Sequence, residues 1–137
     1  MEITVEALIL APLNKVWNAY TTPADIKLWN AASDDWHTTA SHVDLRVGGA
    51  FSSRMEAKDG SFGFDFAGTY SNVVPHKLIA YTFGERTATV EFIQDSDGVT
   101  VSVSFTPETE HTIEEQEEGW QAILNRFAMH VESTKPA

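Results

Sequence analysis

The chain has 137 residues, enough for one domain with a sizeable hydrophobic core, and we take residues 1–137 as a single domain. Its 20 acidic and 9 basic residues give a net charge of −11, which repels phosphate backbones and anionic lipid surfaces and argues against nucleic-acid and membrane partners. Cysteine is absent, which excludes disulfides, thiol catalysis and thiolate metal sites. We expect a cytoplasmic protein, because no stretch has the character of a signal peptide or a membrane span.

The first third of the sequence predicts a strand followed by two short helices. Residues 3–10 alternate apolar and polar before becoming apolar, which indicates a strand. Pro12 and Pro23 each introduce an amphipathic stretch, and proline is well tolerated in the first turn of a helix. Residues 30–41 show no hydrophobic period, so we expect a loop there, although this segment carries Trp36.

The middle of the chain predicts six further strands in an antiparallel sheet. Asp59-Gly60 is typical of a hairpin turn, and Asp97-Gly98 ends a second turn. Apolar and hydroxyl residues alternate from Val99 to Phe105, as in a strand with one buried face. The expected strands are 43–47, 50–58, 61–74, 78–83, 87–93 and 99–106.

Residues 112–133 form the longest helical pattern in the chain, and Pro136 follows its end. Thr112 and Glu115 have the spacing of a capping box, which satisfies free backbone donors at a helix start. Gln116 fills a gap in the apolar face. That face consists of Ile113, Trp120, Ile123, Leu124, Phe127 and Val131.

The order of these elements predicts an α+β protein. An apolar helix face must pack against another layer, so we expect a curved antiparallel sheet of about seven strands wrapped around the C-terminal helix. The two short helices follow the first strand. A strongly curved sheet around one helix leaves a space between them, and such spaces hold ligands. We expect this space to open between residues 26–39 and the long helix, with Trp36 pointing inward on a lid.

Several short motifs occur in this order along the chain. They are Ala11-Pro12 before Val16-Trp17, Thr22-Pro23 before Trp29, Asp44-Leu45-Arg46-Val47-Gly48-Gly49, Gly68-Thr69-Tyr70 before Val74-Pro75 and Leu78, and Gly119-Trp120. Together they resemble the START-like, or SRPBCC, superfamily with its birch-pollen-allergen-like helix-grip fold. Within it they resemble the branch related to the heat-shock-protein ATPase activator.

The resemblance implies a cytosolic single-domain protein with a hydrophobic cavity between the sheet and the long helix. Members of the wider fold bind lipids, sterols, flavonoids or polyketides, and some cyclise polyketides. The branch has no shared catalytic motif that transfers to residues of this chain. Eukaryotic activators carry a separate N-terminal chaperone-binding domain, for which we expect no room here.

The sequence gives no motif for a cofactor or a metal, so we expect neither. The five histidines lack a paired ligand spacing such as His-x-His. The glycines after Val47 lack the lysine and the following helix of a phosphate loop. No serine stands at a strand-to-helix elbow, and catalytic residues remain unassigned.

The expected ligand-binding residues are mainly aromatic side chains from the sheet and the helices. His37 and Asp65 are added as polar groups that orient a ligand, although regular alternation places Asp65 on the face opposite Phe64 and Phe66. The full set is Trp29, Trp36, His37, Phe51, Met55, Phe64, Asp65, Phe66, Tyr81, Phe83, Trp120 and Phe127.

The leading hypothesis is a binding protein, rather than an enzyme, for an apolar or aromatic small molecule of lipid, polyketide or flavonoid type. One alternative is a cyclase or hydrolase in which a pocket carboxylate or His37 moves a proton. Another is an interaction protein that regulates a chaperone or another partner through its surface. A homodimer also remains open.

Overall fold

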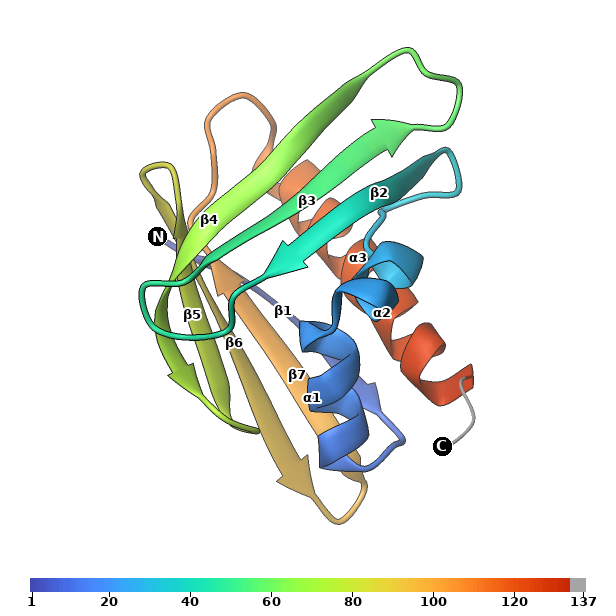
Figure 1. Cartoon of the computed structure of the whole chain (residues 1–137). Coiled ribbons are helices and arrows are strands. Elements are labelled where there is room, and N and C mark those ends of the chain that lie inside the picture. Colours follow the sequence, from blue (N-terminus) through green and yellow to red (C-terminus); the bar gives the residue numbers. More distant parts are fainter. Residues whose placement is uncertain (134–137) are drawn as a thin grey trace.

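The computed structural model describes residues 1–133, and Pro136 lies outside them (Figure 1). Seven strands and three helices follow one another in the expected order. They are β1 (Ile3–Ile9), α1 (Leu13–Thr21), α2 (Pro23–Trp29), β2 (Trp36–Val43), β3 (Ala50–Ala57), β4 (Gly63–Val74), β5 (Leu78–Phe83), β6 (Arg86–Asp95), β7 (Gly98–Phe105) and α3 (Ile113–Ser133).

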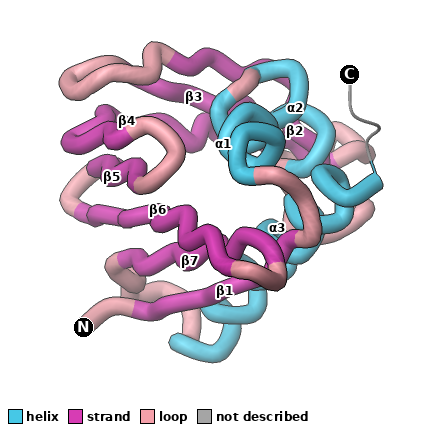
Figure 2. Tube along the Cα trace, turned by 90° about the horizontal axis from the view of Figure 1, so that it is seen from below, coloured by secondary structure: helices cyan, strands magenta, loops and turns pink. Residues whose placement is uncertain are grey.

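The strands form one antiparallel sheet in the order β1-β7-β6-β5-β4-β3-β2. Because β1 pairs with β7, the first strand lies beside the last, and the sheet curls with the helices on its concave side (Figure 2). β7 shows how the sequence produces this arrangement, since Val99, Val101 and Phe105 are fully buried while the hydroxyl residues between them are partly exposed. The predicted α+β class and helix-grip architecture are confirmed.

The long helix α3 is fixed to the sheet through its apolar face. Phe127 and Val131 are fully buried, and the Trp120 ring stacks on Phe105 of β7 at a centroid distance of 4.0 Å. At the start of the helix, the Glu115 backbone N–H donates to Thr112 Oγ1, and the Thr112 N–H donates to the Glu115 carboxylate, both over 3.1 Å. The predicted capping box is therefore present, and the predicted apolar face packs inward from Trp120 to Val131, whereas Ile113 at its start is exposed.

The region around β2 differs from the sequence-based prediction. The expected loop over 30–41 is wrong from Trp36 onward, where β2 begins, and the expected strand over 43–47 is wrong because that segment turns. β2 carries a bulge between Thr38 and Ala40. The bulge breaks the alternation of side chains that would otherwise reveal a strand, because two neighbouring residues become exposed.

Other boundaries shift by a few residues. The turn between β3 and β4 covers 58–62 and is longer than the two-residue turn expected at Asp59-Gly60, with Gly60 in the left-handed region at φ 79°. Pro12 stands immediately before α1 instead of inside it, and its carbonyl accepts the Val16 N–H. Pro23 does occupy the first turn of α2.

Candidate ligand-binding cavity

A cavity of about 430 Å³ lies between the concave face of the sheet and the three helices. Its walls come from β2 to β5, from Val103 on β7, from Arg86 at the start of β6, and from all three helices. Small-molecule sites typically enclose about 300–1,000 Å³ and have mainly apolar walls with few polar groups. The size and the composition of the walls are therefore those of a ligand site.

Most of the aromatic residues that we expected at the site lie on the cavity wall. These are Trp29, Trp36, Phe51, Phe64, Phe66, Tyr81 and Trp120, together with Met55. The Trp29 indole N–H is already occupied, because it donates to the Ala19 carbonyl at 2.9 Å and so fixes α2 against α1. Whether these residues contact a ligand stays a prediction.

The remaining expected residues lie away from the cavity wall. His37 pairs in register with Glu56 at the edge of the sheet, and Asp65 lies 3.5 Å from Arg54 on the outer face with its side chain 67 % exposed. Alternation along β4 explains this position of Asp65. Phe83 and Phe127 are buried in the core and do not border the cavity.

The concave side of β4 is organised by alternation and one glycine. Phe64, Phe66, Gly68 and Tyr70 are two residues apart and point to the same face. A Cβ atom at Gly68 would overlap the Phe51 ring and the Thr82 carbonyl oxygen. The missing side chain therefore lets the Phe51 ring lie across β4, where it forms part of the cavity wall.

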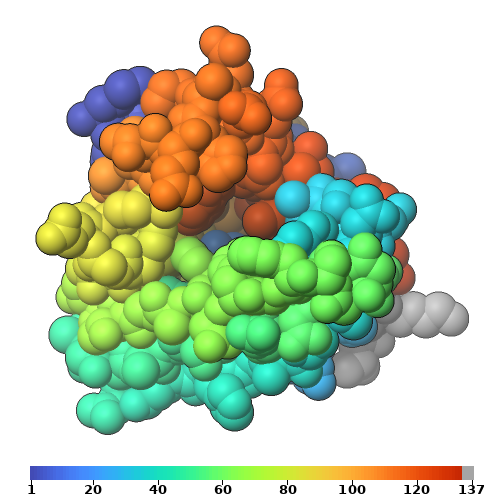
Figure 3. Space-filling view, turned by 90° about the horizontal axis from the view of Figure 1, so that it is seen from above, coloured from blue at the N-terminus to red at the C-terminus, as the bar shows by residue number. Residues whose placement is uncertain are grey.

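The mouth of the cavity lies at the end of the molecule that carries the β3–β4 hairpin. Seen from above, the surface is hollowed between this green hairpin, the orange segment before α3 and the cyan segment after α2 (Figure 3). Trp36, Phe62 and Phe64 form a cluster there, with ring centroids about 6 Å apart, and Phe62 is 55 % exposed. The mouth is thus bordered by apolar rings.

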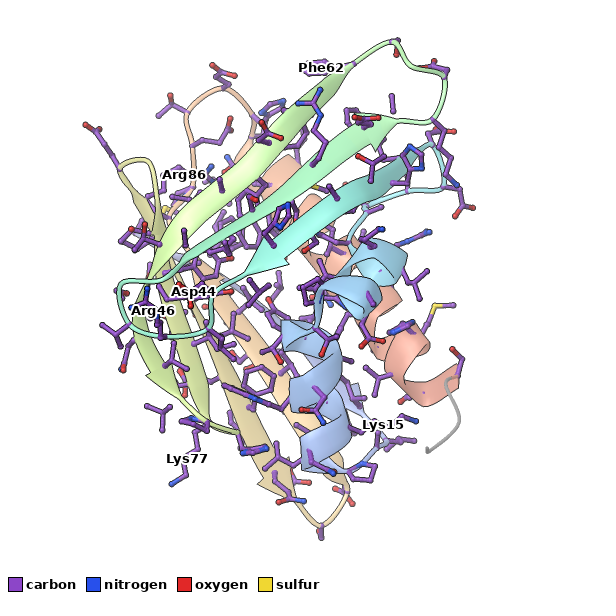
Figure 4. All side chains as sticks on the ribbon, in the orientation of Figure 1. Lys15, Asp44, Arg46, Phe62, Lys77 and Arg86 are labelled. Carbon is purple, nitrogen blue, oxygen red and sulfur yellow. The ribbon has the colours of Figure 1, made fainter. Side chains whose placement is uncertain are left out.

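Arg86 is the cationic side chain at the mouth, as Figure 4 shows at the start of β6. Its Nε–H donates to the Thr106 carbonyl at 2.9 Å, and its guanidinium carbon lies 4.6 Å from the centre of the Phe83 ring. Arg46, Arg54 and Arg126 each pair with a carboxylate, whereas no described carboxylate lies within ion-pair distance of Arg86.

The inner end of the cavity, opposite the mouth, is lined by Tyr20 and Tyr70, with Tyr81 beside Tyr70 in register. Burial raises the pKa of Tyr20 and Tyr81 above the usual value for a phenol. Burial, with the negative charge of Asp44, raises the pKa of Tyr70 to about 12. All three side chains are therefore neutral at physiological pH.

Comparison with known protein families shows to which family the chain belongs. The sequence model of the family described as activator of Hsp90 ATPase homolog 1-like protein matches residues 10–132. The chain belongs to this family. Proteins of the family commonly bind ligands or regulate the Hsp90 ATPase. No curated protein matches the chain.

Solved structures of similar proteins share the whole fold. An AHSA1-like protein from Aeromonas hydrophila is 45% identical, with a TM-score of 0.92, over 97% of this chain and 93% of that one. A protein from Cytophaga hutchinsonii is 43% identical, with a TM-score of 0.84, over 96% and 92%. A protein from Nitrosomonas europaea, at 22% identity and a TM-score of 0.84 over 98% and 96%, shares the fold.

Of the three tyrosines and the arginine that line this AHSA1-like cavity, sequence reasoning found only Tyr81. Tyr20 was recognisable only as part of the buried face of α1, and Tyr70 continues the alternation from Phe64 and Phe66. Either signal indicates burial, but neither shows that the side chain faces an open space. Arg86 precedes the predicted strand and gave no signal.

The titratable groups limit the chemistry that this cavity can perform. No carboxylate among residues 1–133 lines it, and the histidine that borders it is His42, an exposed residue of β2, rather than the expected His37. A surface cluster consists of Glu108, Glu110 and His111, each of which has one potential metal-ligand atom within 4.8 Å of the others. Glu110 and His111 are exposed, and Glu108 is partly exposed.

None of the described helices is long and apolar enough to span a lipid bilayer.

Proposed function

We propose that the protein binds an apolar or aromatic small molecule, of lipid, polyketide or flavonoid type, in the cavity between the sheet and α3. The observation that carries the proposal is the unfilled space of about 430 Å³, which remains although bulky aromatic side chains line it. Apolar walls favour an apolar occupant, because each square ångström of apolar surface removed from water contributes roughly 25 cal/mol.

The enzymatic alternative receives less support from the arrangement of side chains. It requires a general base in contact with the substrate, but no carboxylate among residues 1–133 lines the cavity and His37 lies away from its wall. His42 borders the cavity, but it is an exposed residue of the edge strand β2. The tyrosines cannot serve as general bases instead, because a phenol with a raised pKa stays protonated at neutral pH. Binding without chemistry is the simpler function for such walls.

The proposal is tested by titrating the protein with flavone, dodecanoate and biphenyl while tryptophan fluorescence is followed. Trp29, Trp36 and Trp120 line the cavity, so we expect a bound ligand to quench their emission at micromolar concentrations. Native mass spectrometry of protein freshly purified from cells should also show a co-purified small molecule.

A matched pair of variants locates the binding. Trp36→Ala removes a ring from the cavity wall and should weaken binding about tenfold without unfolding the protein. Phe62→Ala removes a neighbouring exposed ring that does not line the cavity, and should leave the affinity nearly unchanged. If none of the compounds binds wild-type protein, the cavity hypothesis is wrong, and a partner-regulating role through the aromatic surface at the mouth takes its place.

A further inference from the structure

The chain contains three tyrosines, and all of them line the same cavity. They come from three different elements, Tyr20 from α1, Tyr70 from β4 and Tyr81 from β5. Tyr70 and Tyr81 are direct partners in the pairing of their strands, so their side chains lie next to each other on the concave face. Tyr20 approaches them from the helical layer.

The hydroxyl groups of these tyrosines lack a hydrogen-bond partner in the described part of the chain. Tyr70 and Tyr81 are only 8 % and 7 % exposed, yet within residues 1–133 no hydrogen bond involves any of the three hydroxyls. In the same part of the chain, every side-chain nitrogen or oxygen atom that is fully enclosed has a hydrogen-bond partner. The hydroxyls must therefore be accessible, and their place on the wall means that they face the cavity.

The hydroxyls are grouped at the inner end of the cavity. The Tyr70 backbone pairs with Gly48 and Gly49 at 2.8 and 2.9 Å, in the loop that follows β2. Figure 4 shows Asp44 and Arg46 of this loop partway along β4, between Phe62, which marks the mouth, and Lys77, which lies beyond the far end of the strand. A ligand that enters past Phe62 meets apolar rings first and the hydroxyls last.

Neighbouring rings hold the phenols in place. The Phe51 ring centre lies 5.2 Å from that of Tyr70 and 4.9 Å from that of Tyr81. Tyr20 packs edge-on against Phe127 at 5.1 Å. Because the rings are fixed by packing, the hydroxyls are positioned before a ligand arrives, which reduces the entropy lost on binding.

We propose that Tyr20, Tyr70 and Tyr81 form an inner subsite that binds a neutral oxygen group, a ketone, alcohol or phenol, at the leading end of an otherwise apolar ligand. This inference rests on the proposed function. Each phenol has one donor and two acceptor positions, so the three together satisfy either a carbonyl or a hydroxyl. A carboxylate is disfavoured there, because an ion loses far more hydration free energy than a neutral oxygen group on entering an apolar site, and the cationic Arg86 lies at the mouth instead of at this end.

Biphenyl and 4-hydroxybiphenyl provide the test, since they differ by one hydroxyl on the same rigid apolar frame. We expect wild-type protein to bind 4-hydroxybiphenyl on the order of tenfold more tightly than biphenyl, as measured by isothermal titration calorimetry. In Tyr70→Phe and Tyr81→Phe, which keep the ring, this preference should fall toward one while biphenyl binding is retained. Biphenyl-4-carboxylate should bind more weakly than 4-hydroxybiphenyl.

The possible outcomes distinguish a failure of the subsite proposal from a failure of the proposed ligand binding in the cavity. If biphenyl fails to bind wild-type protein, the proposed function itself is wrong. If both compounds bind equally, if the preference survives in the Tyr→Phe variants, or if the carboxylate binds best, the neutral-oxygen subsite is wrong although the cavity binds ligands. Ser102→Ala removes a hydroxyl from the outer face of β7 and should keep the wild-type preference.

Discussion

The two sides of the sheet use similar apolar patterns to different ends. On the side of β1 and β7, the sheet is packed solidly against α3, and Phe105, Phe127 and Val131 are fully buried. On the side of β3 and β4, the inward side chains border the cavity, so that Phe66 is only partly buried and Phe64 is 42 % exposed. Alternating apolar residues thus produce either a core or a cavity, depending on what lies opposite.

Two hydrogen bonds add to the apolar packing that holds α3 over the packed side. The Gln121 side-chain amide donates to the Glu6 carbonyl at 3.0 Å, and the Leu10 N–H donates to the Glu132 carboxylate at 2.8 Å. Both contacts join α3 to β1 or to the residue that follows it. With the helix held at one edge of the curved sheet, β3 and β4 lack a helix directly above them, and the space remains open.

Truncation in the packed side should have the largest effect. Phe127→Ala removes a fully buried ring that contacts Tyr20 and Trp29, and should lower the free energy of unfolding by about 3–5 kcal/mol. Urea unfolding followed by circular dichroism measures this change. A loss below about 1 kcal/mol would show that this side is as loosely packed as the cavity side.

The corresponding truncation in the cavity side should cost less. Phe66→Ala enlarges an existing space instead of creating a new one, so we expect a loss of about 1–2 kcal/mol in the same urea experiment. The enlarged cavity should also accept ligands that are bulkier than those bound by wild-type protein. Equal losses for Phe66→Ala and Phe127→Ala would remove the distinction between the two sides.

The start of α3 should contribute a smaller, local term. Thr112→Ala deletes the side-chain acceptor for the Glu115 N–H and should cost about 1 kcal/mol. Thr112→Ser keeps the hydroxyl and should restore most of this loss. Hydrogen exchange at the first turn of α3 should rise in the alanine variant, while exchange in β7 follows only the global change in stability.

The smallest effect should come from the exposed pair Glu108 and His111, whose ring nitrogen and carboxylate lie 3.0 Å apart. This hydrogen bond raises the pKa of His111 above 6.5 and lowers that of Glu108 below 4.5. The stabilisation linked to His111 is complete below pH 6.5 and is lost as pH rises through the higher folded pKa. That linked to Glu108 is present above pH 4.5 and is lost as pH falls through the lower folded pKa.

A titration of the His111 ring protons by NMR checks the direction of this shift. In wild-type protein the midpoint should lie above 6.5, and Glu108→Gln should move it downward because the carboxylate partner is removed. An unchanged midpoint in the variant would mean that Glu108 does not hold the imidazolium. Stability on both sides of the sheet should remain the same in this variant.

Local patterns in the sequence were sufficient for most of the secondary structure and for the fold class. The capping pair Thr112 and Glu115 and the alternation of β7 depend on residues close in sequence, so their structure follows from spacing alone. β2 was missed because its bulge at Thr38 removes the two-residue period that identifies a strand.

The candidate site was only partly predictable, for a physical reason. Spacing indicates that an aromatic residue is buried, as for Phe51 and Trp120, but burial against a core and burial beside a cavity leave the same pattern in the sequence. Tyr20 lines the same cavity as Tyr70 and Tyr81 only because α1 packs onto β6 and β7, next to the paired strands β4 and β5. The sequence by itself determined which faces are apolar, and the tertiary structure decided which of those faces remain open and which hydroxyls point into the space.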